Sequence, residues 1–333
     1  MRPGTPAFTD LTDALIARIQ EVVEGKPEAV RTAVLVQLAG GHLLVEDVPG
    51  VGKTLLARTL AGALGGSVNR IQFTPDLLPA DITGVSVFHQ ERHDFQFRPG
   101  PVFAHLVIAD EINRASAKTQ AALLEAMEEH RVSVDGTTHR LPDPFMVVAT
   151  QNPSDSQGTY PLPEAQRDRF MARISMGYPD TDAEVLMLAH HTHDPEHASP
   201  VLQDSVEPVT DVDTARELIA ATAMVAVGEP VRRYLVALGQ ATREHADVRV
   251  GASPRALVQW MSAARAEAAL SGRDYVVPDD VRAVAHVVLP HRLLLDGPVR
   301  HDTTSPQARR IVDEVLSQVQ VPFASRAEVR ATR

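Results

Sequence analysis

The sequence predicts an α/β fold, with a parallel sheet covered by helices on both faces, and a smaller all-α domain after it. Up to about Pro179, short apolar runs typical of strands alternate with segments of helical periodicity. Beyond that point helical segments dominate, after a stretch over 194–208 that holds three prolines. We therefore expect an α/β domain over 1–193, a linker over 194–208 and a helical domain over 209–333.

The individual elements follow from periodicity and from turn residues. Short strands are expected at His42–Val45, Val68–Phe73, Leu106–Ala109 and Phe145–Ala149. Hairpins are expected at Val85–Phe97 and Val132–Leu141, the second because Asp135-Gly136 is a strong turn signal. Helices are expected at Leu11–Glu24, Glu28–Leu38, Thr54–Leu64, Ala115–Met127, Asp182–His191, Asp211–Met224, Val231–Thr242, Pro254–Leu270, Asp279–Val288 and Ser305–Val319.

The composition argues against several classes of protein. Lys and Arg number 32 against 43 Asp and Glu, and the net charge of −11 disfavours general binding to nucleic acids or to anionic membranes. Cysteine is absent, which excludes thiol catalysis, disulfides and thiolate metal sites. No apolar run reaches the length of a membrane span, and Met1–Asp10 lacks the apolar core of a secretory signal. We therefore expect no membrane insertion and a cytoplasmic location.

A glycine-rich turn lies between a predicted strand and a predicted helix. Its small residues allow backbone N–H groups to close on phosphate oxygens, Lys53 can reach the outer phosphates, and the hydroxyl of Thr54 can hold Mg²⁺. The strict motif has glycine at position 47, where this chain has Asp47. The alternative is a tight turn that binds nothing. The candidate binding residues are Pro49, Gly50, Val51, Gly52, Lys53, Thr54 and Leu55.

An acidic pair and a later amide supply the rest of the candidate site. Asp110 and Glu111 end a predicted buried strand, which places them at the edge where parallel sheets bind ligands. Asp110 would hold Mg²⁺ through water and Glu111 would polarise the attacking water; N-capping of the next helix is the alternative. After the next strand, Asn152 could orient that water, with Thr150 as the lesser candidate, whereas Asn152-Pro153 is also an ordinary turn.

Together these elements resemble an AAA+ ATPase, a P-loop NTPase, and further stretches resemble the MoxR family of that class. The resemblance runs from about residue 10 to residue 320 and rests on His42–Gly50, Phe73–Pro79, Asp110–Ala115, Thr150–Pro153, Leu162–Gln166, Asp168–Phe170 and Gly251–Ala256. It implies ATP and Mg²⁺ as ligands, a homo-oligomeric ring that is expected to be a hexamer, and chaperone-like remodelling or maturation of protein complexes. It also implies a protein client and a partner with a von Willebrand factor A domain.

The resemblance also assigns roles to several arginines. Arg169 matches the arginine that completes the ATP site of a neighbouring subunit, and Arg114 matches a second arginine near the subunit boundary. Arg167 departs from the family pattern, which has an apolar residue there, and we expect it to be solvated or locally salt-bridged. Arg255 matches the sensor-2 position, in the first helical turn after an N-cap at Ser253.

Some features allow other interpretations. The hairpins 85–97 and 132–141 resemble family insertions that project toward the pore or face of the ring, although simple decoration of the sheet edge is the alternative. The histidines within 190–197 could bind a metal, but such a run is more often a solvated helix end. The alternative functions are the motor subunit of a magnesium or cobalt chelatase, a nucleotide-gated switch with little turnover, and a DNA-remodelling motor.

Overall fold

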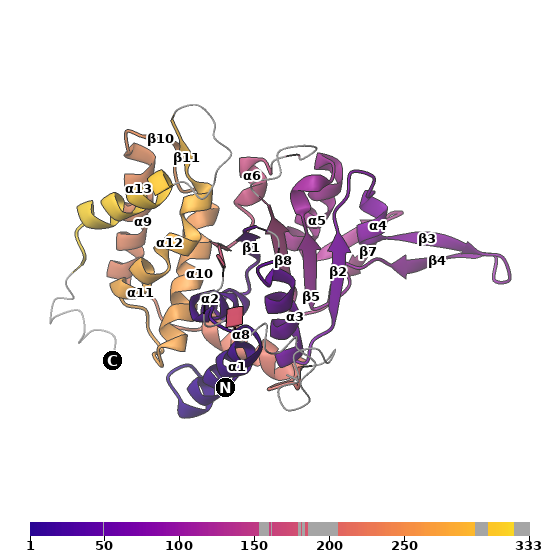
Figure 1. The fold of residues 1–333 in the computed structure, drawn as a ribbon, viewed down its shortest axis with the longest axis horizontal. Helices are drawn as coiled ribbons and strands as arrows, with labels where there is room; N and C mark the ends of the chain where they lie inside the picture. Colours follow the sequence, from indigo (N-terminus) through magenta and orange to yellow (C-terminus); the bar gives the residue numbers. More distant parts are fainter. Residues whose placement is uncertain are drawn as a thin grey trace. The chain divides into compact units, whose positions relative to one another are not determined.

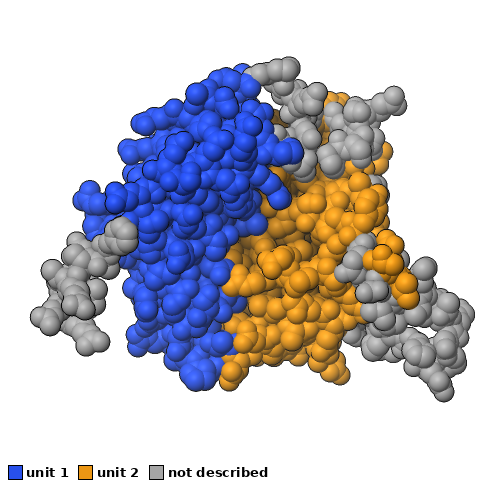
Figure 2. Space-filling view, turned by 60° about the vertical axis from the view of Figure 1, so that its left-hand side comes forward, with its two compact units in different colours: residues 1–9, 220–333 blue, residues 10–219 orange. Residues whose placement is uncertain are grey.

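The computed structural model describes residues 1–48, 50–152, 160, 162–178, 181, 184–185, 206–296 and 306–322. The chain divides into two compact units, which Figure 2 shows in different colours. One unit is Asp10–Ile219, and the other joins Met1–Thr9 to Ala220–Arg333. Most of the predicted linker 194–208 lies outside the described residues, so the predicted domain boundaries stay a prediction.

The larger unit is built on a parallel five-stranded sheet with the order β2-β5-β8-β1-β9 (Figure 1). The strands are β1 (Leu43–Glu46), β2 (Val68–Gln72), β5 (Leu106–Asp110), β8 (Met146–Gln151) and β9 (Ala172–Ile174). The central strands β1 and β5 are buried along their whole length. Side chains alternate between the two faces of a strand, so this burial means that both faces are covered, as the sequence predicts.

Strand β9 is the one strand of this sheet that the sequence does not predict. It is three residues long and carries a charged residue, Arg173, at its centre, so it gives no apolar run. The guanidinium of Arg173 donates to Glu46 Oε2 at 2.8 Å, and both side chains are almost fully buried. A buried ion pair of this kind is tolerated because each charge has its partner. The two residues are 127 positions apart, which is why periodicity does not reveal the strand.

Helices pack around this sheet, and one apolar core includes Leu44, Val107, Val147 and Leu123. The helices of this unit are α2 (Pro27–Leu38), α3 (Lys53–Ala63), α4 (Pro79–Thr83), α5 (Ala117–Glu129) and α6 (Glu164–Arg167), whereas α1 (Pro6–Val22) and α8 (Val212–Ala223) each have their larger part in this unit and continue into the other. Most lie within a few residues of the predicted ranges, whereas the short helices α4 and α6 were not predicted. The predicted helix from Ala115 starts later, because a 3₁₀ turn, η1 (Ile112–Arg114), comes first and the hydroxyl of Ser116 caps α5.

Both predicted hairpins are present. Strands β3 (Gly84–His89) and β4 (Asp94–Pro99) form one, and β6 (Arg131–Val134) and β7 (Thr137–Arg140) form the other. The second turns at Asp135-Gly136, where both residues have positive φ, as a type I′ turn requires. Figure 1 shows β3 and β4 extending away from the sheet.

The smaller unit is predominantly helical, as the sequence predicts. Its core contains the fully buried Trp260, whose indole N–H donates to the backbone oxygen of Val281 at 2.8 Å. The helices are α9 (Glu229–Glu244), α10 (Pro254–Leu270), α11 (Pro278–Ala283), α12 (Ala285–Val288) and α13 (Pro306–Gln318). The predicted helix 279–288 is thus two short helices. The sequence also does not predict a small antiparallel pair of strands, β10 (Val248–Val250) and β11 (Leu294–Leu295), or the 3₁₀ turn η3 (Pro290–Arg292) that lies just before β11.

Two sequence predictions fall on parts of the chain that the structure leaves undescribed. The predicted helix 182–191 and the histidines within 190–197 lie almost wholly outside the described residues. Among the helices that are described, none combines the length and the apolar character that a membrane crossing needs.

Candidate nucleotide-binding site

The glycine-rich loop connects the end of β1 to the start of α3. Gly50 and Gly52 have φ of 85° and 89°, a backbone conformation that residues with a Cβ rarely adopt. Gly52 is the N-cap of α3, so the free N–H groups of the first helical turn follow it directly. A loop and helix start of this kind bind anions through backbone N–H groups. Pro49 lies outside the described residues.

Lys53, the first residue of α3, bends back over the loop. Its Nζ donates to the backbone oxygen of Asp47 at 2.7 Å. Burial lowers the pKa of Lys53, while the negative charges of Asp47, Asp110 and Glu111 oppose that shift. The ammonium group is therefore partly desolvated and in the electrostatic field of all three carboxylates, where it can contact a phosphate oxygen.

Asp47 stands where the strict motif has glycine, and its carboxylate anchors the loop. Oδ2 accepts hydrogen bonds from the hydroxyl of Ser175 at 2.9 Å and from the N–H of Gly177 at 2.6 Å. Oδ1 accepts one from the N–H of Val48 at 2.8 Å. Burial opposes ionisation of Asp47, but these bonds outweigh it and hold its pKa below the ordinary value. The departure from the strict motif thus ties the loop to the segment after β9.

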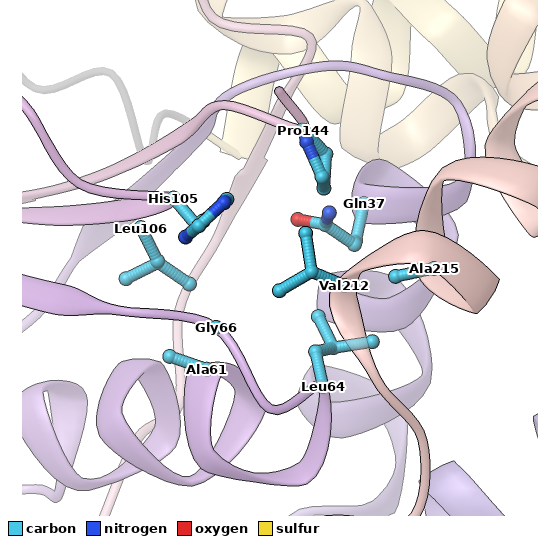
Figure 3. A pocket seen from close by; sticks show the side chains of 9 residues that line it. All are labelled: Gln37, Ala61, Leu64, Gly66, His105, Leu106, Pro144, Val212 and Ala215. Carbon is cyan, nitrogen blue, oxygen red and sulfur yellow. The ribbon is translucent and has the colours of Figure 1, made fainter. Parts of the chain in front are cut away.

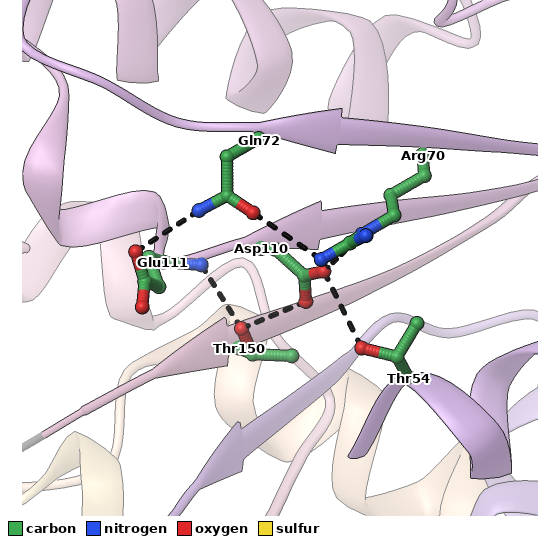
Figure 4. Close-up of polar contacts among 6 residues, drawn as sticks. All are labelled: Thr54, Arg70, Gln72, Asp110, Glu111 and Thr150. Carbon is green, nitrogen blue, oxygen red and sulfur yellow. Dashed lines mark hydrogen bonds and ion pairs between the residues drawn. The ribbon is translucent and has the colours of Figure 1, made fainter. Parts of the chain in front are cut away.

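Asp110, the last residue of β5, is 5% exposed and lies at the centre of the polar network in Figure 4. The hydroxyl of Thr54 donates to Asp110 Oδ2 at 3.3 Å, and that of Thr150 donates to Oδ1 at 3.1 Å. The guanidinium of Arg70 donates to the same Oδ2 at 2.6 Å. The fold therefore brings together Thr54 and Asp110, the predicted pair, which are 56 positions apart in the sequence.

Glu111 turns sharply out of the line of β5. Its φ of 55° is unusual for a residue with a side chain and is the type of strain found at functional positions. Its N–H donates to the hydroxyl of Thr150 at 2.9 Å, and its Oε2 accepts from Gln72 and Arg114, each at 2.9 Å. Its side chain makes no N-capping hydrogen bond, so the alternative reading of the acidic pair as a helix cap is not supported.

Arg70 and Gln72 are the two site residues that the sequence analysis missed. They lie on β2, which pairs with β5 and puts Gln72 opposite Asp110. Two residues apart on one strand, they share a face of the sheet. That spacing was visible in the sequence, but which strand neighbours β5 was not. Arg114, predicted for the subunit boundary, contacts Glu111 within its own chain.

The remaining predicted residues lie at defined positions, although their roles stay predictions. Asn152 directly follows β8 and is half-buried. Arg169 donates to Glu128 Oε2 at 2.8 Å. Arg255 is exposed in the first turn of α10, which Ser253 caps as predicted.

Arg167 is half-buried, between full solvation and full burial. Burial lowers its pKa, against the attraction of Glu46 and Glu164. Glu46 and Glu164 are the carboxylates whose charges act on it, and the expectation of a solvated or locally salt-bridged charge stays a prediction.

A small pocket lies at the opposite, amino-terminal end of the sheet. Figure 3 shows its lining, in which leucine, valine, alanine and proline side chains meet few polar ones. The lining residues are Gln37, Ala61, Leu64, Gly66, His105, Leu106, Pro144, Val212 and Ala215. It offers neither the glycine-rich loop nor the carboxylates of the first site.

The parallel sheet, the glycine-rich loop and the acidic strand end together define an AAA+ ATPase. In agreement, the model of the ATPase family associated with various cellular activities (AAA) matches residues 42–172, and the model of the AAA lid domain matches residues 240–315. The chain belongs to the MoxR family of AAA+ ATPases. The residues that match the lid model all lie in the smaller, predominantly helical unit.

Several known proteins are similar along nearly the whole chain. The protein YeaC of Bacillus subtilis, which is uncharacterised, is 46% identical over 95% of this chain and 96% of its own length. Chaperone MoxR1 of Mycobacterium tuberculosis is 40% identical over 96% of this chain and 84% of its own. A crystal structure of a candidate ATPase from Cytophaga hutchinsonii is 35% identical, with a TM-score of 0.84 and coverage of 95% and 96% of the two chains.

Proposed function

We propose that this protein is a Mg²⁺-dependent ATPase that hydrolyses ATP to ADP and phosphate. The observation that carries the proposal is the meeting of Thr54, Asp110 and Glu111 beside the glycine-rich loop. A hydroxyl and a buried carboxylate share a hydrogen bond, and a second carboxylate follows directly. This is the set of groups that holds a metal–phosphate complex and activates a water next to it.

The residues fit Mg²⁺, which prefers oxygen ligands and is commonly held by one or two carboxylates together with substrate phosphates. Thr54 and Asp110 would hold it. The described residues contain no group of three or more histidine, aspartate or glutamate side chains that could enclose a metal ion alone. A site that depends on the phosphates of the substrate agrees with that finding. When bound, Mg²⁺ neutralises charge on the phosphate oxygens.

The side chains of this protein divide the remaining work. Lys53 and the N–H groups at the start of α3 bind the outer phosphates. The carboxylate of Glu111 accepts the proton of the attacking water, whose oxygen bonds to the γ-phosphorus while the bond to the β-phosphate oxygen breaks. Gln72 and Arg114 both bind Oε2 of Glu111, which orients the carboxylate. We assign the orientation of the water to Asn152.

We also propose that the site is completed in a homo-oligomeric ring, which the family resemblance implies to be a hexamer. Arg169 would stabilise the transferred phosphate in the site of a neighbouring subunit. Arg255 would act as the sensor-2 arginine of the lid domain, and for this role we keep the predicted division into domains. Within its own chain Arg169 pairs with Glu128, on a groove that Glu125 and Arg131 also line. A trans-acting arginine contributes roughly 10³–10⁵ in rate, so hydrolysis should depend on protein concentration.

The energy of hydrolysis would drive chaperone-like remodelling of protein complexes. The relative named Chaperone MoxR1 supports this role. The family resemblance adds a partner with a von Willebrand factor A domain and a protein client, in the cytoplasm. The acidic net charge of −11 supports a protein client over a nucleic acid.

Phosphate release at increasing protein concentration tests the proposal. Glu111→Gln keeps the size of the side chain but removes the proton acceptor, so we expect hydrolysis to fall by roughly 10²–10⁴-fold while ATP binding persists. Glu21→Gln, an exposed residue of α1, is the matched control and should hydrolyse ATP as the unmodified protein does. Full turnover by Glu111→Gln would refute the proposed role, and no turnover of the unmodified protein at any concentration would favour a nucleotide-gated switch.

A further inference from the structure

Arg70 makes a contact that the proposed mechanism does not use. Its Nε donates to Asp110 Oδ2 at 2.6 Å, and this oxygen also accepts the hydroxyl of Thr54. Thr54 and Asp110 are the two residues proposed to hold Mg²⁺. A guanidinium of this chain therefore already binds the carboxylate oxygen that a divalent cation would use.

The two partners of this ion pair differ in their freedom to move. The side chain of Arg70 is 49% exposed, whereas that of Asp110 is 7% exposed. A half-exposed arginine loses little when it exchanges a carboxylate for water. A buried carboxylate, in contrast, needs a compensating cation at all times. Asp110 can thus exchange one cation for another, and Arg70 is the partner that can leave.

The contacts of Arg70 continue to the proposed catalytic carboxylate. Its Nη2 donates to Gln72 Oε1 at 3.3 Å, and Gln72 Nε2 donates to Glu111 Oε2 at 2.9 Å. Figure 4 shows the resulting path, in which Arg70 and Gln72 on β2 connect the carboxylates of Asp110 and Glu111. Because the amide of Gln72 uses its oxygen toward one residue and its nitrogen toward the other, a change at Arg70 alters the orientation of the amide that holds Glu111.

We propose that Arg70 is a positioning residue that competes with the divalent cation for Asp110 and, through Gln72, couples occupation of the metal site to the orientation of Glu111. This inference rests on the proposed nucleotide and Mg²⁺ binding. Arg70 is thus an internal cation that neutralises Asp110 before the metal binds. The cost of displacing Arg70 weakens metal-dependent binding, and its release frees Gln72 to reorient Glu111.

The test measures binding without turnover. Fluorescence anisotropy gives the dissociation constant of a fluorescent non-hydrolysable ATP analogue, measured once in Mg²⁺ and once in EDTA. We compare variants by the ratio of the dissociation constant in EDTA to the dissociation constant in Mg²⁺. Arg70→Met removes the competing cation, so we expect this ratio to rise about fivefold, the size of a half-exposed ion pair. Binding in EDTA should weaken slightly, since Asp110 then repels the phosphates.

Matched variants separate competition from other effects. Arg58→Met removes an exposed arginine of α3, four residues after Thr54, and should leave the ratio unchanged. Gln72→Leu should raise the ratio by less than Arg70→Met, and the double variant should equal Arg70→Met alone, because both changes interrupt one path. Circular dichroism checks that all variants are folded.

Each other outcome contradicts the proposal. An unchanged or lower ratio in Arg70→Met would mean that Arg70 supports Asp110 or binds phosphate itself, while the proposed ATPase function would stand. An equal rise of the ratio in Arg58→Met would show that loss of any nearby positive charge produces the effect. Independent, additive effects of the Arg70 and Gln72 variants would refute the coupling. Failure of the unmodified protein to bind the analogue would overturn both this inference and the proposed function.

Discussion

The two ends of the five-stranded sheet carry different properties. At the carboxyl end, Thr54, Asp110, Thr150 and Glu111 form one hydrogen-bonded network. At the amino end, the same strand β5 begins with Leu106, in a pocket with mostly apolar walls. Ligands of parallel sheets bind beyond the carboxyl ends of the strands, while the other end contributes mainly packing. The comparison suggests that substitutions at the amino end change stability, and that those at the carboxyl end change chemistry.

A substitution at the amino end has the largest expected effect on stability. Leu106 is 3% exposed, and Leu106→Ala removes buried methyl groups beside an existing pocket, so we expect a loss of roughly 3 kcal/mol in the free energy of unfolding. Urea denaturation measures this loss, and the affinity of the folded variant for an ATP analogue should stay within about twofold.

The exposed Leu78 provides a control for the removal of a leucine side chain. Leu78→Ala should change the free energy of unfolding by less than about 0.5 kcal/mol. If Leu106→Ala weakened nucleotide binding as strongly as a substitution in the loop does, the two ends would not be functionally separate.

Asp47, at the carboxyl end, should show a smaller effect that depends on pH. Because folding lowers the pKa of Asp47 from 3.8, its ionised form stabilises the fold fully above that pH, and the contribution is lost as pH falls through the folded pKa. Asp47→Asn should therefore cost about 1 kcal/mol at pH 7 and progressively less below pH 3.8.

Denaturation of the Asp47→Asn variant across this pH range provides the measurement. The deficit of Leu106→Ala should stay constant over the same range, because that substitution removes no titratable group. A deficit of Asp47→Asn that is equal at pH 7 and pH 3 would show that the charge of Asp47 does not stabilise the loop.

The sequence predicted those parts of the fold whose cause is local. Apolar runs located β1, β5 and β8, and Asp135-Gly136 located the turn of a hairpin, because burial and turn geometry select residues directly. Strand β9 was missed because the charge of Arg173 is neutralised by Glu46, which is distant in sequence. Periodicity cannot reveal an ion pair across a sheet.

The residues of the candidate site were likewise predictable where a local motif or a strand end indicates them. Lys53, Thr54, Asp110 and Glu111 follow from a motif and from a strand end, and the structure brings Thr54 and Asp110 into contact. Arg70 was not predicted, because its contact with Asp110 depends on β2 pairing with β5, and strand order is a property of the whole fold. The sequence thus indicates which residues have suitable chemistry, and the topology decides which of them meet.

Binding of an ATP analogue to Lys53→Ala tests the central claim most directly. Lys118, an exposed lysine of α5, provides the matched control variant Lys118→Ala. If the loop binds a triphosphate, loss of the Lys53 ammonium should weaken the affinity about a hundredfold, the effect of one or two charge-assisted hydrogen bonds, whereas Lys118→Ala should bind as the unmodified protein does. Equal affinities of the two variants and the unmodified protein, measured in Mg²⁺, would contradict the account.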